Sequence, residues 1–202
     1  MDRAGKRVDR RVLRSRRAII EAFERLLVGQ DLERITVSAI AREANIDRKT
    51  FYVHFGTIDG LLDAVAEEMV ERIVATVDER LAITVPAARP QVALSTFFET
   101  LNSVVLSNLA LNRRFFESVP TDTLLLRFCR PLGRLFIARG MVPAGMGEEL
   151  FGYHLTYLLG GIVSIYRAWV LSDGAVPIQD ISDAALALTL RGLSSVDAER
   201  IA

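Results

Sequence analysis

Apolar residues recur at three- and four-residue spacing along nearly the whole chain, and this pattern constrains the fold more than any other feature of the sequence. Such spacing places apolar side chains on one face of an α-helix, whereas a half-buried strand shows strict alternation. The few proline and glycine residues lie between the periodic segments, where they separate one helix from the next. The sequence therefore predicts an all-α protein, with helices at about 9–28, 37–44, 48–55, 58–83, 91–109, 112–118, 122–139, 147–172 and 179–195.

Charge is unevenly divided between the two ends of the chain, although the formal net charge is zero. Residues 1–58 hold 13 Lys and Arg against 8 Asp and Glu, while residues 59–202 hold 12 against 17. Within residues 1–20, only Asp2 and Asp9 oppose a dense cluster of arginines and one lysine. Because such clusters attract polyanions, most often nucleic acid, we expect the N-terminal end to contact DNA or RNA.

Other function classes find little support. No apolar run with a small-residue cleavage site follows the basic start, so a cytoplasmic protein is expected rather than a secreted one. The longest uncharged run, 150–166, contains glycines, tyrosines and a histidine, which favours a buried helix over a membrane span. Cys129 is the only cysteine and is interpreted as a structural thiol.

Catalytic chemistry is not predicted either. The chain has two histidines, His54 and His154, and the sequence shows no metal-ligand cluster, phosphate-binding loop or nucleophile elbow. We therefore expect no enzyme activity, no catalytic residue, no metal site and no cofactor.

The segment TVSAIAREANIDRKTFYVHF, residues 36–55, has the spacing of a helix-turn-helix. Ala41 is small where the two helices would cross, and Asn45 tolerates the left-handed backbone that the turn requires. Thr36, Asp47 and Thr57 are the expected N-caps of the two short helices and the long helix that follows. An ordinary helical hairpin with a solvated charged face is the alternative interpretation of this spacing.

The first half of the second short helix would expose polar side chains of the kind that contact base edges and phosphates. Arg48 and Lys49 suit guanine or phosphate, Thr50 a thymine methyl or phosphate, and Tyr52 a phosphate. This helix is therefore predicted to enter the major groove of DNA.

From about Arg14 to Leu62 the chain resembles the DNA-binding domain of the tetracycline-repressor (TetR/AcrR) family. The resemblance is carried by AFERLLVGQDLERITVSAIAREANIDRKTFYVHF and by the Leu61-Leu62 pair that follows. It implies a transcriptional regulator that binds a palindromic operator in double-stranded DNA as a homodimer, usually a repressor that a small-molecule effector releases. The contacts it implies are phosphates for Thr36 and Ser38, the major groove for Arg48, Lys49 and Thr50, and the DNA backbone for Tyr52 and His54.

One position departs from that family. Many relatives have a lysine just after the aromatic-His-Phe segment, whereas this chain has Gly56, Thr57 and Ile58. We expect the arginine-rich N-terminal arm to offset the lost phosphate contact, because each neutralised phosphate adds salt-dependent affinity.

The C-terminal half is expected to bind the effector and to dimerise. Helices 147–172 and 179–195 are apolar on more than one face, which predicts a four-helix bundle with a second copy. Residues 1–58 would form the DNA-binding domain, joined by a long helix to the effector and dimerisation domain, 59–202. Some of the following residues would line the effector pocket: Phe97, Phe98, Phe115, Phe116, Phe128, Phe136, Tyr153, His154 and Tyr157.

Two alternatives remain open at this point. About forty residues that include Tyr157, Gly160-Gly161 and Trp169 resemble the branch of the family typified by the activator of dihydroxyacetone kinase operons, which favours an activator that uses a co-regulator. A non-enzymatic helical interaction protein is the other alternative, and it predicts no sequence preference in DNA binding.

Overall fold

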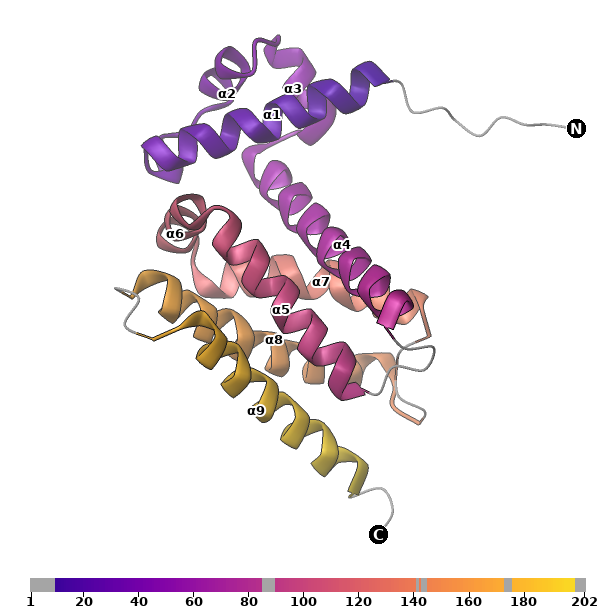
Figure 1. Ribbon diagram of the computed structural model, residues 1–202. Coiled ribbons are helices and arrows are strands. Elements are labelled where there is room, and N and C mark those ends of the chain that lie inside the picture. Colours follow the sequence, from indigo (N-terminus) through magenta and orange to yellow (C-terminus); the bar gives the residue numbers. More distant parts are fainter. Residues whose placement is uncertain (1–9, 85–89, 141, 143–144, 173–175, 199–202) are drawn as a thin grey trace, which may run out of the picture. The chain divides into compact units, whose positions relative to one another are not determined.

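The computed structural model describes residues 10–84, 90–140, 142, 145–172 and 176–198, and its regular structure over these ranges is entirely helical. The predicted all-α fold is confirmed, with boundaries within a few residues of those expected. The helices are α1 (Arg10–Gly29), α2 (Val37–Glu43), α3 (Arg48–Phe55), α4 (Ile58–Thr84), α5 (Pro90–Ser107), α6 (Leu109–Ser118), α7 (Thr121–Ala138), α8 (Glu148–Leu171) and α9 (Ile178–Ala198), with a 3-10 turn, η1, at Leu32–Arg34 (Figure 1).

The chain forms two compact units, Met1–Val65 and Ala66–Ala202. The division falls inside α4, while the sequence placed it at the start of that helix, between residues 58 and 59. The first two turns of α4 therefore belong to the N-terminal unit, and the rest of the helix belongs to the C-terminal unit.

In the N-terminal unit, α1 packs against both short helices, α2 and α3. A helix as short as α2, with seven residues, does not hold its shape alone in water. Burial of apolar side chains supplies the missing stability, at about 1.5–3 kcal/mol for each large side chain. The largest fully buried side chains of this core are Ile19, Phe23, Leu27, Ile40, Phe51 and Leu61.

The connection from α3 to α4 depends on two glycines. Gly56 ends α3 with a φ of 70°, in the left-handed region that glycine adopts without strain. Gly60, in the first turn of α4, lies against the end of α3, where a Cβ would collide with the carbonyl oxygen of Phe55. This close approach fixes where α4 leaves the N-terminal unit.

The C-terminal unit is organised around α8, which packs against α6, α7 and α9. One core cluster joins α5, α8 and α9 through buried side chains that include Phe98, Tyr166 and Ala185. A second joins α4, α7 and α8 through Val70, Leu132, Leu155 and Leu159. None of the described helices is long and apolar enough to cross a membrane.

Candidate nucleic-acid interface and apolar cavity

The turn between α2 and α3 has the geometry predicted for it. Asn45 has a φ of 53°, and the amide of Ile46 donates to the carbonyl of Ala41 at 2.9 Å. Thr36 caps α2, because its hydroxyl oxygen accepts from the amide of Ala39 at 3.1 Å. Asp47 does occupy the N-cap position of α3, but its side chain makes no capping hydrogen bond, so that part of the expectation was wrong.

Helix α3 turns two side chains inward and several outward. Phe51 and Phe55 are buried, whereas Arg48, Lys49 and Tyr52 are exposed, the last at 55%. Neither Arg48 nor Lys49 forms an ion pair with any described residue, so both charges are available to an external partner.

The other residues predicted to contact DNA lie in different environments. Thr36 and Ser38 are exposed at the start of α2, while Thr50 is half-buried. His54 is half-buried too, and its Nε2 lies 2.7 Å from Oγ of Ser15 on α1. The structure thus gives His54 a partner inside the unit, and its contact with the DNA backbone stays a prediction.

The Ser15 hydroxyl has two neighbours. It donates to the carbonyl of Val12 at 3.0 Å, and it lies 2.7 Å from Nε2 of His54, where the tautomer of the imidazole sets the direction of the hydrogen bond. Burial lowers the pKa of His54 below its ordinary value, and the nearby positive charge of Arg16 lowers it further. The imidazole is therefore held neutral near pH 7.

Arg16 also contacts the end of α3 directly. Its guanidinium carbon lies 4.9 Å from the centroid of the Phe55 ring, within the range of a cation–π interaction. Sequence reasoning predicted the arginine cluster but missed this use of it, and it missed Ser15 entirely. Both residues face α3 from α1, about 40 positions earlier in the chain, and local spacing carries no signal of such a contact.

Just after Phe55, where many relatives have a lysine, this chain has Thr57, which caps α4. The Thr57 hydroxyl accepts a hydrogen bond from the amide of Gly60 at 2.9 Å, as predicted for the N-cap of α4. On α1, Arg14 and Arg17 are exposed, and Arg17 pairs with Glu21 at 2.9 Å. The predicted role of the N-terminal arm falls largely on residues 1–9, which lie outside the described residues.

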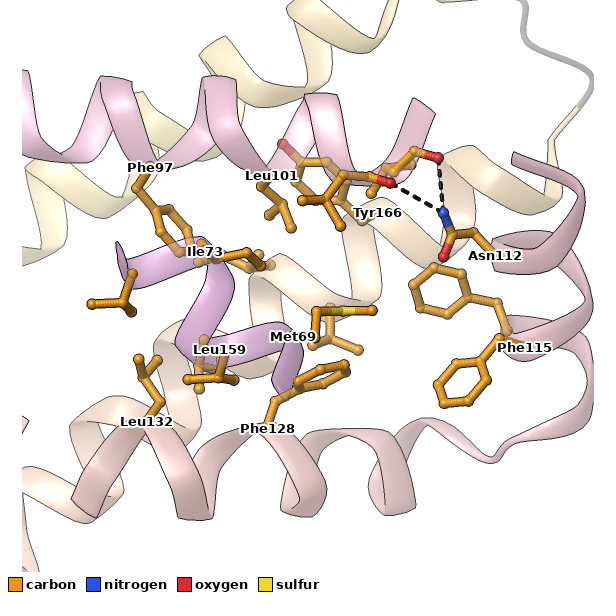
Figure 2. Close-up of a pocket in the computed structure, with 17 residues that line it drawn as sticks. Met69, Ile73, Phe97, Leu101, Asn112, Phe115, Phe128, Leu132, Leu159 and Tyr166 are labelled. Carbon is orange, nitrogen blue, oxygen red and sulfur yellow. Dashed lines mark hydrogen bonds between the residues drawn. The ribbon is translucent and has the colours of Figure 1, made fainter. Parts of the chain in front are cut away.

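The C-terminal unit contains an apolar cavity between α4, α5, α6, α7 and α8 (Figure 2). Its volume is about 840 Å³ with the open mouth included. The wall consists almost entirely of aliphatic and aromatic side chains, among them Met69, Ile73, Leu101 and Leu159.

The pocket candidates from the sequence are divided by the structure. Phe97, Phe115, Phe116 and Phe128 line the cavity. Phe98 and Phe136 instead pack in the two core clusters. The remaining three residues do not line the cavity. Tyr153 and Tyr157 are 67% and 81% exposed, and His154 Nδ1 lies 2.9 Å from the carbonyl of Leu150 in its own helix.

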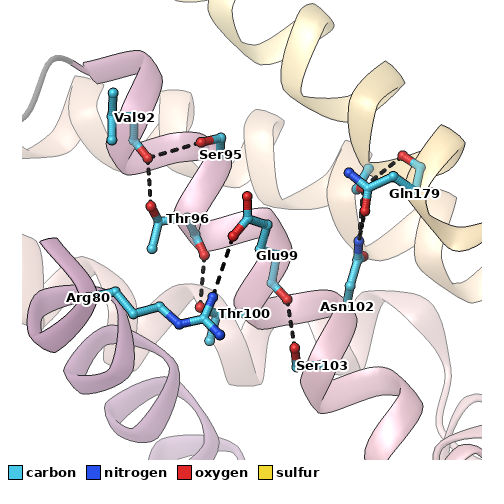
Figure 3. Close-up of polar contacts among 10 residues, drawn as sticks. Arg80, Val92, Ser95, Thr96, Glu99, Thr100, Asn102, Ser103 and Gln179 are labelled. Carbon is cyan, nitrogen blue, oxygen red and sulfur yellow. Dashed lines mark hydrogen bonds and ion pairs between the residues drawn. The ribbon is translucent and has the colours of Figure 1, made fainter. Parts of the chain in front are cut away.

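A buried polar network, which sequence reasoning missed, connects the cavity wall to α9. The hydroxyl of Tyr166 donates to Oδ1 of Asn102 at 2.6 Å, and Nδ2 of Asn102 donates to Oγ of Ser182 at 2.9 Å. Figure 3 shows Asn102 of α5 turned toward Gln179 of α9, whose Oε1 lies 3.5 Å from Nδ2. Burial raises the pKa of Tyr166 far above its ordinary value, so this hydroxyl keeps its proton and remains a donor.

Helices α8 and α9 together form a second, more open depression on the surface of the C-terminal unit. Its lining includes Tyr157, Gly160, Gly161 and Leu188, and Leu188 is 67% exposed. Exposed apolar side chains of this size, gathered on two helices, mark a surface suited to association.

Comparison with known sequences finds a family match within the N-terminal unit. Residues 19–65 match the family described as bacterial regulatory proteins, tetR family. Over 79 residues the chain is 40% identical to the uncharacterised HTH-type transcriptional regulator YxbF of Bacillus subtilis (strain 168). This match covers 39% of this chain and 20% of that protein. A 66-residue match to the HTH-type transcriptional regulator AlkX of Mycobacterium tuberculosis is 36% identical and covers 33% of this chain and 31% of that protein. Both matches thus span less than a third of the relative's length.

Solved structures extend the likeness to the helical fold of the chain. The fatty acid degradation regulator FadR from Bacillus halodurans aligns with a TM-score of 0.60 at 15% identity, over 85% of this chain and 96% of that one. FadR from Bacillus subtilis in complex with stearoyl-CoA gives 0.57 at 17% identity, with 85% and 96% coverage. The dihydroxyacetone kinase operon activator DhaS gives 0.54 at 16% identity, with 89% and 96% coverage. At these identities the likeness establishes the fold, and it does not distinguish an activator from a repressor.

Proposed function

We propose that this chain, whose residues 19–65 match the tetR family of bacterial regulatory proteins, is an effector-responsive repressor of transcription. In this proposal a homodimer binds a palindromic operator and leaves it when a small molecule occupies the cavity of the C-terminal unit. The observation that carries the proposal is that Arg48 and Lys49 are exposed, with no ion pair to any described residue, on a helix whose opposite face is buried in a core.

The geometry of α3 suits a recognition helix. Burial of Phe51 and Phe55 fixes the rotation of the helix about its axis, and rotation decides which side chains meet base edges. Arg48 and Lys49 then lie in the first turn, next to the exposed Tyr52. Thr36 and Ser38, at the start of α2, are placed to contact phosphates that fix the register on the duplex.

The apolar surface of α8 and α9 supports the homodimer. A two-fold dimer uses the same patch on both copies, so the exposed Tyr157 and Leu188 would be covered by their symmetry mates. Two copies present two recognition helices, which matches a palindromic operator with half-sites about one helical turn apart.

The cavity supports the effector. It is concave and apolar, as binding sites for small molecules usually are. The structure of FadR from Bacillus subtilis was solved with stearoyl-CoA, which shows that one protein of this fold takes up a small molecule with a long hydrocarbon chain.

The test of DNA binding is a mobility-shift assay with the intergenic DNA upstream of the protein's own gene. The double variant Arg48→Ala plus Lys49→Ala is expected to lose at least a hundredfold in affinity, because contacts to bases and phosphates are lost together. Arg72→Ala plus Arg130→Ala is the matched control, since it removes two exposed arginines from α4 and α7 of the C-terminal unit. Equal binding of the wild-type protein to random DNA would contradict the proposal.

A reporter gene behind the same DNA tests the direction of regulation. We expect transcription to fall when the protein is present and to recover with the Arg48→Ala plus Lys49→Ala variant. A rise in transcription that depends on the same two residues would show an activator instead.

A further inference from the structure

The wall of the cavity lacks any group that could neutralise a charged ligand. None of the side chains lining it is ionisable apart from the tyrosine Tyr166, whose pKa is raised by burial and whose ring forms part of the wall. Burying a carboxylate or phosphate without a cation or a set of donors is costly, so the interior of this cavity disfavours anions.

Only two of the lining side chains, Asn112 and Tyr166, have hydrogen-bonding nitrogen or oxygen atoms. The Tyr166 hydroxyl donates its proton to Asn102 at 2.6 Å, and Figure 2 shows this hydroxyl beyond Leu101, away from Phe115 and Phe128. Tyr166 therefore presents mainly its ring to the cavity. Asn112 remains as the group able to orient a ligand.

The orientation of the Asn112 amide is fixed by the end of α5. Its Nδ2 donates to the carbonyl of Val105 at 2.8 Å and approaches that of Val104 at 3.4 Å. Both carbonyls belong to the last turn of α5, where the helix supplies no amide partners of its own. A flipped amide would set its oxygen against two carbonyl oxygens, so Nδ2 is held there and Oδ1 faces the opposite way.

Oδ1 of Asn112 is consequently an uncommitted acceptor. Figure 2 shows the amide nitrogen turned toward the two carbonyls and the oxygen turned back toward the aromatic side chains near Phe115. Among the described residues no hydrogen bond reaches this oxygen. A lone acceptor in an apolar wall selects for a donor and repels another acceptor or an anion.

We infer that the cavity takes a neutral, hydrocarbon-rich molecule whose buried end is a hydrogen-bond donor, a hydroxyl or an amide N–H, received by Oδ1 of Asn112. This inference rests on the proposed function, because it names the class of effector for the same cavity.

Three probes of nearly equal size, with eleven or twelve non-hydrogen atoms, test the inference. Their binding to the full-length protein is measured by calorimetric titration at pH 8. They are 1-decanol, which donates, 1-methoxynonane, which can only accept, and decanoate, which is charged. We expect 1-decanol to bind about tenfold more tightly than the ether, the usual worth of one hydrogen bond, and over a hundredfold more tightly than decanoate. Decanoate binding as tightly as 1-decanol, equal binding of the alcohol and the ether, or no binding of any probe would each overturn the inference.

Two variants locate the binding. Val163→Phe adds a ring to the cavity wall on α8 and should abolish binding of 1-decanol, whereas Val28→Phe makes the same change at an exposed position of α1 and should not. Asn112→Leu should reduce the preference for alcohol over ether to about onefold. If Asn112→Leu fails to fold, the comparison of the three probes in the wild-type protein still tests the inferred ligand class.

The mobility-shift assay separates this inference from the proposed function. If 1-decanol binds but DNA is not released, the ligand class stands and the effector-responsive mechanism fails. In the opposite case, an anionic ligand releases DNA and loses its binding in Val163→Phe, which places its anionic end in the cavity, while decanoate binds as tightly as 1-decanol. The effector-responsive mechanism then stands and the inferred ligand class is wrong.

Discussion

The two units of this protein use polar side chains in opposite ways. In the N-terminal unit the important polar groups, Arg48 and Lys49, are exposed and form no ion pair within the part of the chain that the structure describes. In the C-terminal unit Asn102, Tyr166 and Ser182 are buried and satisfy one another. A surface that contacts DNA must leave its hydrogen-bonding groups free for the DNA. In a cavity wall, a polar group without a hydrogen-bond partner raises the free energy of the folded state, because it has been removed from water. Only Oδ1 of Asn112 departs from this rule in the wall, and that departure is what points to a ligand.

The largest expected effect concerns the buried network. Asn102→Ala removes the acceptor of Tyr166 and the donor to Ser182, and each group left unsatisfied costs about 1–3 kcal/mol. We expect the C-terminal unit to lose about 3 kcal/mol in its free energy of unfolding. Urea titration followed by the fluorescence of Trp169, the single tryptophan, measures it. Gln91→Ala, at an exposed position of the same helix, is the control and should change the free energy by less than about 0.5 kcal/mol. A similar small loss in Asn102→Ala would break the contrast between the units.

A second prediction compares two glycines, one in each unit. Gly60→Ala places a methyl group against the Phe55 carbonyl and should destabilise the N-terminal unit by about 2 kcal/mol. Gly152→Ala, at an exposed and open position of α8, should stabilise its helix by about 0.5–1 kcal/mol. Hydrogen exchange of the α3 and α8 amides reports each unit separately. Equal effects of the two substitutions would show that α4 does not need close contact with the end of α3.

The smallest expected effect is the pH dependence that His54 contributes. Its pKa is lowered in the folded state by burial and by Arg16, so the unfolded chain binds the proton more readily. The stabilising contribution is therefore complete above about pH 6.5, the ordinary pKa, and declines as the pH falls toward the folded value. Urea titrations of the wild-type protein between pH 7.5 and 5.5 should show this decline.

Two variants sharpen the His54 prediction. His54→Gln should flatten the part of the profile that His54 contributes, because no proton is then taken up at this position on unfolding. Ser15→Ala removes the partner of His54 in the 2.7 Å hydrogen bond and should cost about 1 kcal/mol at pH 7.5. A wild-type profile that rises as the pH falls, and that becomes level in His54→Gln, would contradict the assigned direction.

Much of the N-terminal unit could be predicted because its determinants are local. Thr36 and Thr57 cap the helices that begin beside them, and Asn45 takes the left-handed backbone its side chain tolerates. Exposure of Arg48 and Lys49 follows from the helical spacing of Phe51 and Phe55. The partners of His54 and Phe55 could not be found in the same way, because Ser15 and Arg16 lie on another helix and local spacing does not encode which helices meet.

The helices, their approximate ends and the helix-turn-helix were predictable without the structure, because they depend on periodicity, caps and turn residues within a few positions. The roles of the aromatic residues in the C-terminal unit depend instead on how the helices pack. Phe97 lines the cavity while its neighbour Phe98 is buried in a core cluster, and Tyr157 lies exposed on the surface. Helices that are apolar on several faces offer more than one packing, so the destination of each side chain depends on which helix lies against it.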